Sequence, residues 1–509
     1  MGTGRTEFEL KFTGSPGDVA KLPNSDFIGA IAPHGAWEKL VSTYYDTPDE
    51  AFTGKGLSLR LREEGASLVQ AVKAKGANAV SRVEYERELD TEADFPKKCG
   101  DQEIDALIRL YKKSLRPIAR ISVERWSAII SFKGSRIELA VDVGTAESWG
   151  RDGSKNLCPL AEVELELIEG EPKTVFALAR LLIGNAPLRL STGTKLATAL
   201  ALRTPPDNLP SNSKVTVTAE TKASAALRQT LDATAARLSA LQRHLVEFRA
   251  PEAIHQMRVA LRRLRSIERV YRPFLKTDEI ADLAAQAKTY ADVLGAARDW
   301  DVLLGETIPA TQTSDYAPSG LRLLKANAEV KRAEAWAEVI EAIDHEHFTC
   351  FLLSIVEASV IAKWSLKARP SLQLPVIEFA PPILDKALKR TKKLSKTLDG
   401  VQELSARHPM RIALKKFRYP VQLFRSAYPK SKRKDYMGAL SMLQEAFGRI
   451  NDAVVAQSLV DIAAKDAGPE AIRAAGFIAG FKAAEAQAAA EQIDQAWAVF
   501  AAQRPFWQE

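Results

Sequence analysis

Cysteine is scarce in this sequence, and long uncharged apolar runs are missing from it. The three cysteines, Cys99, Cys158 and Cys350, lie far apart among 509 residues. This spacing excludes a disulfide-stapled secreted scaffold and a zinc site built from paired cysteines. The sequence has no uncharged apolar run of about 18 residues, and residues 1–12 are charged where a signal peptide would be apolar. We therefore expect a soluble, cytoplasmic protein with no membrane partner.

Signatures of two common enzyme classes are also missing. No Gly-x4-Gly-Lys-Ser/Thr segment occurs, which excludes a phosphate-binding loop of the Walker type. Residues 1–203 contain a single histidine, His34, in a Pro-His-Gly segment that is typical of a turn. A Ser/His/Asp hydrolase site in this half of the chain is therefore not credible.

The composition excludes disorder of the whole chain and favours several domains. Hydrophobic residues make up 46% and charged residues 27% of the 509 residues, a length that suits two to four domains. Residues 1–200 hold 27 basic and 29 acidic side chains, whereas residues 201–509 hold 44 and 35. The second part of the chain is therefore expected to favour an anionic partner.

A proline-rich segment divides the chain. Thr-Pro-Pro-Asp-Asn-Leu-Pro-Ser-Asn-Ser has neither a helical nor a strand period and reads as a linker. We predict a first domain over 1–203, a linker over 204–221 and a second domain over 222–509. Period-two segments precede the linker and 3.6-residue periods follow it, so the predicted fold class is multidomain α+β.

The first domain contains five period-two segments that predict strands. They are residues 7–12, 57–62, 82–86, 138–142 and 161–167. Each has one apolar and one ionic face, with carboxylates on the first and last segments and arginines or lysines between them. A solvated surface would explain one such strand. Five favour a closed antiparallel β-barrel, covered by helices, with charged side chains lining its lumen.

The predicted lumen has a definite chemistry. Clustered carboxylates suit Mg²⁺ or Mn²⁺, and convergent arginines and lysines suit a polyanion with several phosphates. Metal-assisted phosphoryl transfer follows, with water attacking a terminal phosphoanhydride and no covalent nucleophile required.

An ordered set of short motifs resembles the CYTH superfamily of triphosphate tunnel metalloenzymes over roughly residues 1–200. In chain order the motifs are Glu7-x-Glu9-x-Lys11, Arg60-x-Arg62, Lys73 in Gln-Ala-Val-Lys, Asp142 before Val-Gly, Glu162-x-Glu164 and Lys195. The resemblance implies a tunnel in which divalent metal is held by Glu7, Glu9, Glu162 and Glu164. It implies that the phosphates are gripped by Lys11, Arg60, Arg62, Lys73, Arg125 and Lys195. The catalytic set is then Glu7, Glu9, Lys11, Glu162 and Glu164, while the roles of Glu84, Asp142 and Glu166 stay open.

The second domain is predicted to be all-helical. Periods of 3.6 residues cover 223–248, 253–274, 278–294 and 434–463. His255-Gln-Met-Arg-Val-Ala-Leu-Arg-Arg-Leu-Arg matches His408-Pro-Met-Arg-Ile-Ala-Leu-Lys-Lys-Phe-Arg, and Leu294-Gly with Asp299 matches Phe447-Gly with Asp452 at the same offset. We predict two repeated helical bundles, about 222–369 and 376–509.

A basic stripe recurs in the two copies. Helical steps of three and four residues join His255, Arg258, Arg262, Arg265 and Arg269 in the first copy. The second copy has His408, Arg411, Lys415 and Arg418. A solvated face, or salt bridges to Asp299 and Asp452, would explain a stripe in one helix. Recurrence favours an anion between the helices, although each histidine taken alone is more typical of a structural position.

The paired His-x-x-Arg helices resemble the CHAD domain over roughly residues 220–509. The resemblance implies that inorganic polyphosphate lies along this stripe, in contact with the nine residues just named. Repeated phosphates match repeated guanidinium groups without base reading. Nucleic acid is disfavoured, because only Tyr271 and Tyr419 could stack bases near the stripe.

The leading hypothesis is a metal-dependent inorganic triphosphatase, with inorganic triphosphate as substrate, joined to a polyphosphate-binding domain. One alternative is a non-catalytic polyphosphate-binding protein. Another is a different CYTH activity, either thiamine triphosphatase or adenylate cyclase. The sequence does not indicate the oligomeric state or the preferred metal.

Overall fold

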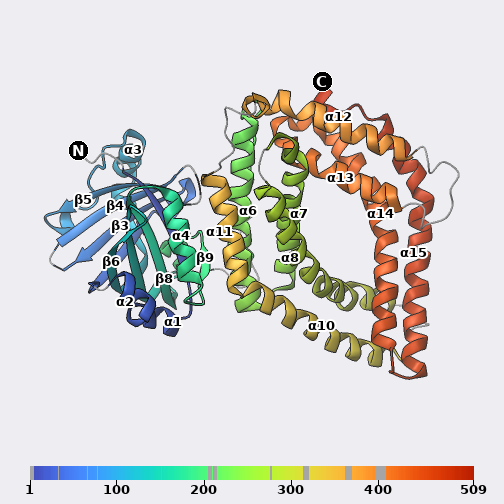
Figure 1. Cartoon of the computed structure of the whole chain (residues 1–509), viewed down its shortest axis with the longest axis horizontal. Coiled ribbons are helices and arrows are strands. Elements are labelled where there is room, and N and C mark those ends of the chain that lie inside the picture. Colours follow the sequence, from blue (N-terminus) through green and yellow to red (C-terminus); the bar gives the residue numbers. More distant parts are fainter. Residues whose placement is uncertain are drawn as a thin grey trace. The chain divides into compact units, whose positions relative to one another are not determined.

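The structure is a computed structural model of the chain (Figure 1). It describes residues 5–32, 34–65, 67–76, 78, 80–150, 152–203, 209, 215–275, 278–312, 320–361, 370–395 and 408–508, without the side chains of Lys75 and His408. The described residues form two compact units. Unit 1 comprises those of Met1–Asn212, Leu231–Phe248 and Asp344–Ala362, and unit 2 comprises the rest.

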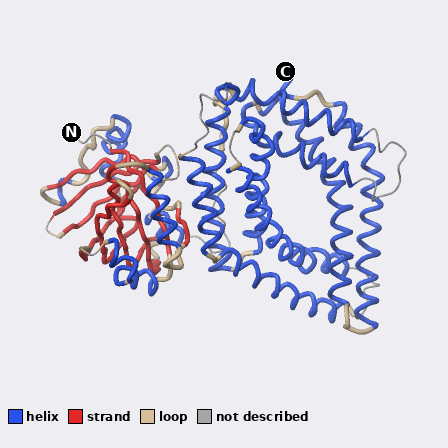
Figure 2. Tube along the Cα trace, in the orientation of Figure 1, coloured by secondary structure: helices blue, strands red, loops and turns tan. Residues whose placement is uncertain are grey.

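Unit 1 is built on an antiparallel sheet (Figure 2). Its strands are β1 (Arg5–Thr13), β2 (Ala36–Asp46), β3 (Leu57–Glu64), β4 (Ser67–Lys75), β5 (Ser81–Leu89), β6 (Arg116–Phe132), β7 (Ser135–Trp149), β8 (Lys155–Glu169) and β9 (Arg189–Ser191). The strand order is β5-β4-β3-β2-β6-β7-β8-β1-β9, and β1 also pairs with β5. Because β1 pairs with both β5 and β8, strands β1 to β8 close into a barrel. This confirms the predicted closed antiparallel barrel.

The five predicted strands all lie within strands of the barrel, in β1, β3, β5, β7 and β8. Their alternation works as expected. In β1, Leu10 and Phe12 are fully buried on one face, where the neighbouring Phe8 ring lies 5.9 Å from the ring of Phe176. Glu9 shares the other face with its register partner on β8, Glu166.

Five short helices accompany the barrel in the first 203 residues. They are α1 (Pro16–Lys21), α2 (Asp26–Ile31), α3 (Gln102–Tyr111), α4 (Pro172–Ile183) and α5 (Lys195–Ala201). Single 3-10 turns lie at η1 (Leu22–Asn24), η2 (Thr53–Lys55), η3 (Glu92–Asp94) and η4 (Lys112–Ser114). His34 lies in an exposed turn, as predicted.

Helix α5 fills part of the barrel with apolar side chains. Leu196 and Ala199 of α5 belong to a buried cluster with Leu40 of β2, Val123 of β6 and Leu160 of β8. The register pairs Leu40 with Val123, and the alternation of β6 puts Val123 on the same face as Arg125. An apolar plug therefore adjoins the charged part of the lumen.

The described chain after residue 222 is helical. Its elements are α6 (Ala223–Phe248), α7 (Pro251–Tyr271), η5 (Arg272–Phe274), α8 (Glu279–Val302), the π-turn η6 (Leu303–Thr307), α9 (Ile308–Gln312), α10 (Leu321–Ile343), α11 (Glu346–Val360), η8 (Pro370–Gln373), α12 (Val376–Ser395), α13 (His408–Phe424), η11 (Arg425–Ala427), α14 (Lys430–Ala464), α15 (Pro469–Ala502) and η12 (Phe506–Gln508). Residues 231–248 of α6 and the whole of α11 belong to unit 1. The all-helical prediction is confirmed, and α8 continues past its predicted end at Leu294.

Unit 2 brings the two His-x-x-Arg helices together. They are α7 and α13, which contact each other, while α14 and α15 run side by side (Figure 1). Aromatic rings of α14, α15 and η12 pack in its core, where the ring of Tyr436 lies 5.2 Å from the ring of Phe500 and 5.2 Å from the ring of Trp507. The division into two repeats stays a prediction, and most of the predicted linker 204–221 lies outside the described residues.

Candidate functional site

The acidic residues predicted to hold metal share the inner face of β1 and β8. The register places Glu9 opposite Glu166, Lys11 opposite Glu164 and Thr13 opposite Glu162. Directly paired residues of antiparallel strands point to the same side, so these side chains all enter the lumen. Glu9, Glu162 and Glu164 are buried, each less than one-tenth exposed. Carboxylates at this depth require partners.

Two lysines supply those partners at Glu164. Nζ of Lys11 lies 2.6 Å from Oε1 of Glu164 and 3.2 Å from Oε1 of Glu9. Nζ of Lys195, the first residue of α5, lies 2.5 Å from the same Oε1 of Glu164 and 3.2 Å from Oε2 of Glu162. Three of the four predicted metal ligands and two of the three predicted phosphate-binding lysines therefore meet at one point in the lumen.

Arg125 is held from two sides. Its Nε and Nη2 donate to the two carboxylate oxygens of Asp142 on β7, both at 2.7 Å, and Nη2 also lies 2.7 Å from Oε2 of Glu164. Asp142 is fully buried and also lies 2.9 Å from Nζ of Lys195. The side chain of Asp142, whose role the sequence left open, therefore orients two of the predicted phosphate-binding residues.

A second group of charges lies on β3, β4 and β5. Nζ of Lys73 is 3.2 Å from Oε2 of Glu7 and 2.8 Å from Oε2 of Glu84. Nη2 of Arg60 is 3.3 Å from Oε1 of Glu84, and Arg62 forms ion pairs with Glu64 and Glu86. The structure thus brings Glu7 to Lys73, on the opposite side of β1 from Glu164.

The proton affinities reflect this crowding. Burial and the neighbouring Glu84 raise the pKa of Glu7 to about 8. Burial also raises the pKa of Glu162, against the effect of Lys195. Burial alone would raise the pKa of Glu164, but Lys11, Lys195 and Arg125 together hold it well below its ordinary value. For Lys11, the carboxylates of Glu164 and Glu9 outweigh burial and raise its pKa.

The lumen has the donor atoms that a divalent cation prefers. Carboxylate oxygens are hard ligands of the kind bound by Mg²⁺ and Mn²⁺, and the buried Oε2 of Glu162 has the Lys195 ammonium 3.2 Å away as its partner. Within the described part of the chain, however, no three Asp, Glu, His or Cys side chains are arranged to hold a metal ion. The ammonium groups of Lys11 and Lys195 lie between the carboxylates instead. The oxygen atoms are of the kind that such a cation prefers, and in this structure they are paired with the ammonium groups.

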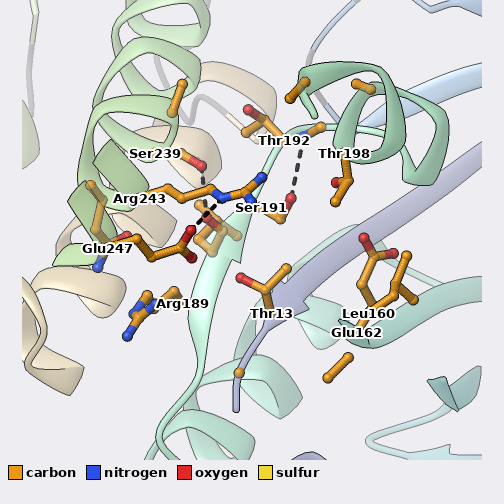
Figure 3. A pocket seen from close by; sticks show the side chains of 18 of the residues that line it. Thr13, Leu160, Glu162, Arg189, Ser191, Thr192, Thr198, Ser239, Arg243 and Glu247 are labelled. Carbon is orange, nitrogen blue, oxygen red and sulfur yellow. Dashed lines mark hydrogen bonds and ion pairs between the residues drawn. The ribbon is translucent and has the colours of Figure 1, made fainter. Parts of the chain in front are cut away.

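Two cavities adjoin the barrel. One, of about 370 Å³, lies between β1, β8, β9 and α6, and Figure 3 shows Thr13, Glu162, Ser191 and Arg243 around it. The other, of about 520 Å³, is lined by polar residues such as Lys73 and by apolar residues of β3 and α5. Arg82, which lines this second cavity, was not among the predicted site residues. Its inward alternation with Glu84 was the available signal.

The predicted basic stripe is partly assembled in unit 2. The positive charges of Arg258 and Arg262 on α7 both lower the pKa of Lys415 on α13. Arg258 and Arg418 in turn lie close enough to Arg262 to repel its positive charge. Burial lowers the pKa of Arg262, and Arg258 and Arg418 lower it further. Burial lowers the pKa of His255, and the positive charges of Arg262 and Arg258 lower it further. These side chains repel one another, as the sequence predicted.

The other predicted members of the stripe make fewer interactions with the group formed by Arg258, Arg262 and Lys415. Arg411 of α13 adds to burial in lowering the pKa of Lys415. In the described parts of the chain, no ion pair or resolved electrostatic effect joins Arg265 or Arg269 to the group. The side chain of His408 lies outside the described residues, although α13 begins at it.

Two aspartates accompany the stripe. Nη1 of Arg258 lies 3.5 Å from Oδ1 of Asp299 and also approaches the carbonyl oxygen of Gly295 at 3.4 Å. Asp452 raises the pKa of Arg411 and of Lys415, against the effect of burial. Against the effect of burial, Arg298 lowers the pKa of Asp299 and Lys482 lowers the pKa of Asp452. Neither of these two basic residues was predicted from the sequence. Tyr271, considered as a stacking residue, is fully buried between Phe379 and Phe424 and cannot stack a base.

Comparison with protein families gives two adjacent matches. The CYTH domain model matches residues 5–200, and the CHAD domain model matches residues 219–461. The chain carries a CYTH domain followed by a CHAD domain. The resemblances predicted from both sets of motifs are therefore confirmed.

Curated relatives of the chain include a protein named for a triphosphatase activity. Over 192 residues the chain is 28% identical to a Haemophilus influenzae protein named inorganic triphosphatase, covering 37% of this chain and 53% of that protein. It is 29% identical over 314 residues to the Mycobacterium tuberculosis protein named Uncharacterized protein Rv2226, covering 58% of each. The chain thus spans little more than half the length of these relatives.

A solved structure resembles the CHAD domain. The crystal structure of the CHAD domain from the plant Ricinus communis is 26% identical, with a TM-score of 0.50, and the match covers 58% of this chain and 98% of that one. None of the helices in the described residues combines the length and hydropathy needed to cross a membrane.

Proposed function

We propose that the CYTH domain hydrolyses inorganic triphosphate with Mg²⁺ or Mn²⁺, and that the CHAD domain binds inorganic polyphosphate. The main support for the first part is the meeting of Lys11, Lys195 and Arg125 around Glu164 inside a closed barrel. Three cations around one carboxylate can transfer their hydrogen bonds to phosphate oxygens when substrate enters. The printed name of the Haemophilus influenzae relative supports the same reaction.

The reaction needs little beyond positioning and charge. Water attacks the terminal phosphorus, the phosphoanhydride bond to the leaving diphosphate breaks, and the products are phosphate and diphosphate. Lys11, Arg125 and Lys195 hold the phosphate chain and stabilise charge on its oxygens. Asp142 keeps Arg125 in place through two hydrogen bonds of 2.7 Å.

The proposed metal is held by carboxylates of β1 and β8. Glu7, Glu9, Glu162 and Glu164 would supply its oxygen ligands. When bound, a divalent cation neutralises charge on the phosphate oxygens and lowers the cost of water attack. The burial of Glu9, Glu162 and Glu164 side by side on the inner face of β1 and β8 supports this assignment.

Phosphate release from inorganic triphosphate tests the first part. We expect turnover by the full chain with Mg²⁺ or Mn²⁺, none in EDTA, and its loss in Glu9→Gln. Glu63→Gln is the matched control, because Glu63 lies on β3 with 56% exposure and is 3.8 Å from Arg120. Triphosphate binding without turnover by the unmodified chain would instead favour a binding module. Full turnover in Glu9→Gln would refute the metal assignment.

A second candidate substrate class is an organic triphosphate. The cavity of about 520 Å³ beside Lys73 is lined partly by Leu57, Leu196 and Leu200, and apolar surface of this kind could accept an organic group. Thiamine triphosphate and ATP therefore belong in the substrate panel with inorganic triphosphate and long-chain polyphosphate. A larger kcat/KM for either organic substrate would favour this candidate.

The second part is supported by the facing basic residues of α7 and α13. Burial and Arg258 lower the pKa of Arg262, and both arginines add to burial in lowering the pKa of Lys415. A bound polyanion would relieve this repulsion. Competition at matched salt tests it: long-chain polyphosphate should displace labelled single-stranded RNA from the full chain. Salt-dependent RNA binding that polyphosphate cannot displace would favour nucleic acid as the partner.

A further inference from the structure

We propose that Ser239 and Thr349, two hydroxyl residues of the helical region, position Lys195 of the tunnel through strand β9. Both lie in segments that match the CHAD model, yet α11 and residues 231–248 of α6 pack in the same compact unit as the barrel. This inference rests on the proposed triphosphatase reaction, in which Lys195 contacts substrate.

Both hydroxyls bind the backbone of one short segment. Oγ of Ser239 on α6 donates to the carbonyl oxygen of Leu190 at 2.7 Å (Figure 3). Oγ1 of Thr349 on α11 donates to the carbonyl oxygen of Leu188 at 2.8 Å. Leu188 and Leu190 are each 3% exposed, so these carbonyl groups have little access to water. Losing either donor would leave a buried acceptor poorly satisfied, which is costly.

Strand β9 is too short to fix its own position. It has three residues and pairs with β1, where Leu190 lies opposite Phe12. Strands of this length contribute few ladder hydrogen bonds. A third contact from the helical region supplements them, because Nε of Arg189 lies 2.6 Å from Oδ1 of Asp344. Side chains from outside the barrel thus contact three successive residues, 188 to 190, of which the last two belong to β9.

The position of β9 sets the position of Lys195. Five residues lead from Leu190 to Lys195, at most about 18 Å of extended chain. The turn between them is fixed locally: Ser191 Oγ accepts from the amide of Gly193 at 3.3 Å, and Thr194 Oγ1 accepts from the amide of Ala197 at the start of α5. A shift of β9 would therefore reach Lys195, whose Nζ lies 2.5 Å from Glu164. Misplacement by about 1 Å can cost a hundredfold in rate.

Helix α11 has an independent attachment, so removing one hydroxyl should not detach it. Nη2 of Arg180 on α4 lies 2.5 Å from Oε2 of Glu357 and 3.2 Å from Oγ of Ser354, both on α11. A buried hydroxyl on the same helix gives a matched control. Ser359 is 4% exposed, and its hydroxyl donates to the carbonyl oxygen of Val356 within α11 itself.

A double-mutant cycle in the full chain tests the inference. The variants are Ser239→Ala with Thr349→Val, Lys195→Ala and the combination of all three, with Ser359→Ala as control and Thr349→Ser as the conservative rescue. The readouts are kcat and KM for inorganic triphosphate and the melting temperature. If Lys195→Ala abolishes turnover, the same cycle is measured by calorimetry as triphosphate affinity in EDTA.

We expect the Ser239→Ala, Thr349→Val variant to lose about tenfold in kcat/KM, mainly through KM. In the Lys195→Ala background the same pair should change kcat/KM or affinity less than about twofold, because coupled residues are not additive. Ser359→Ala and Thr349→Ser should stay close to the unmodified chain.

Two results would overturn the positioning role: an equal loss with and without Lys195, or an unchanged kcat/KM in the Ser239→Ala, Thr349→Val variant. An unmodified chain that does not hydrolyse triphosphate would refute the proposed function instead. In that case the calorimetric cycle still decides whether the two hydroxyls act through Lys195.

Discussion

Lys11 and Glu164 face each other across the pairing of β1 and β8, with Nζ 2.6 Å from Oε1. The same carboxylate accepts from Lys195 and Arg125. Glu164 is therefore the common counter-charge of three cations that belong to three different elements of the barrel domain. We expect the negative charge of Glu164 to have two roles: it keeps these cations in place and it binds the metal.

Glu164→Gln should accordingly lower both activity and stability. We expect triphosphate hydrolysis to fall about a hundredfold or more, the range seen when one preorganised electrostatic contact is lost. The melting temperature should fall as well, because Lys11, Lys195 and Arg125 keep their charges inside the barrel. Phosphate release and thermal unfolding measure the two effects. Glu169→Gln is the control, since Glu169 lies on the same strand with 73% exposure. Retained turnover in Glu164→Gln would contradict the proposed site.

Asp142→Asn should affect stability more than any other single carboxylate change on β7. Asp142 is fully buried and is bonded to both Arg125 and Lys195. Removing one partner of a buried ion pair costs about 3–5 kcal/mol, because Arg125 loses a bidentate partner. Urea unfolding of the full chain measures the change. Asp90→Asn, at a side chain 93% exposed, should leave the transition unchanged. Equal transitions for the two variants would refute the structural role of Asp142.

The sequence predicted the closed barrel and its charged inner face, but not the apolar plug that fills part of it. Alternation in β1 and β8 placed Glu9 and Glu164 correctly, because period two survives any sheet arrangement. Alternation also holds in β6, but there Arg120 and Glu124 lie on the exposed face, while Val123 on the inner face is buried against α5. There the inner face meets an apolar plug for part of its length. Which residues a plug covers depends on tertiary contacts that no local pattern contains.

The helical half was predictable in its elements but not in its grouping. The apolar period gave the bounds of α6 without error, since amphipathicity is a local signal. It could not indicate that the last part of α6 and the whole of α11 would pack with the barrel. That grouping depends on single contacts such as Thr349 to Leu188 and Arg180 to Glu357. The partners in these two contacts are separated by 161 and 177 positions in the sequence. A local apolar period does not indicate contacts over such separations.

Polyphosphate binding should weaken in alkaline solution. Lys415 is more than one-third exposed, but partial burial, Arg411 and Arg262 lower its pKa from 10.5 to about 8. A bound polyanion favours the charged ammonium, so binding takes up a proton above pH 8 and affinity falls as pH rises from there. Without ligand the sign is opposite: the unfolded chain binds more protons between pH 8 and 10.5, so stability rises over that window. Calorimetry in buffers of different ionisation enthalpy measures the uptake. Lys415→Arg should remove the pH dependence, and an unchanged profile in this variant would contradict the assignment.

Arg262→Gln should separate binding from stability, with changes of opposite sign. Without ligand, Arg262 is repelled by Arg258 and Arg418 and has no ion pair among the described residues, so its removal should leave the melting temperature equal or slightly higher. Polyphosphate affinity should fall by about fivefold to tenfold, since a charge-assisted hydrogen bond is lost. Arg136→Gln is the control, because Arg136 lies on β7, outside the stripe, is 56% exposed and pairs with Glu169 at 3.8 Å. Titration with long-chain polyphosphate at two salt concentrations measures the affinity, and the salt dependence should weaken only in Arg262→Gln. A lower melting temperature together with unchanged affinity would show that Arg262 stabilises the helices rather than binding an anion.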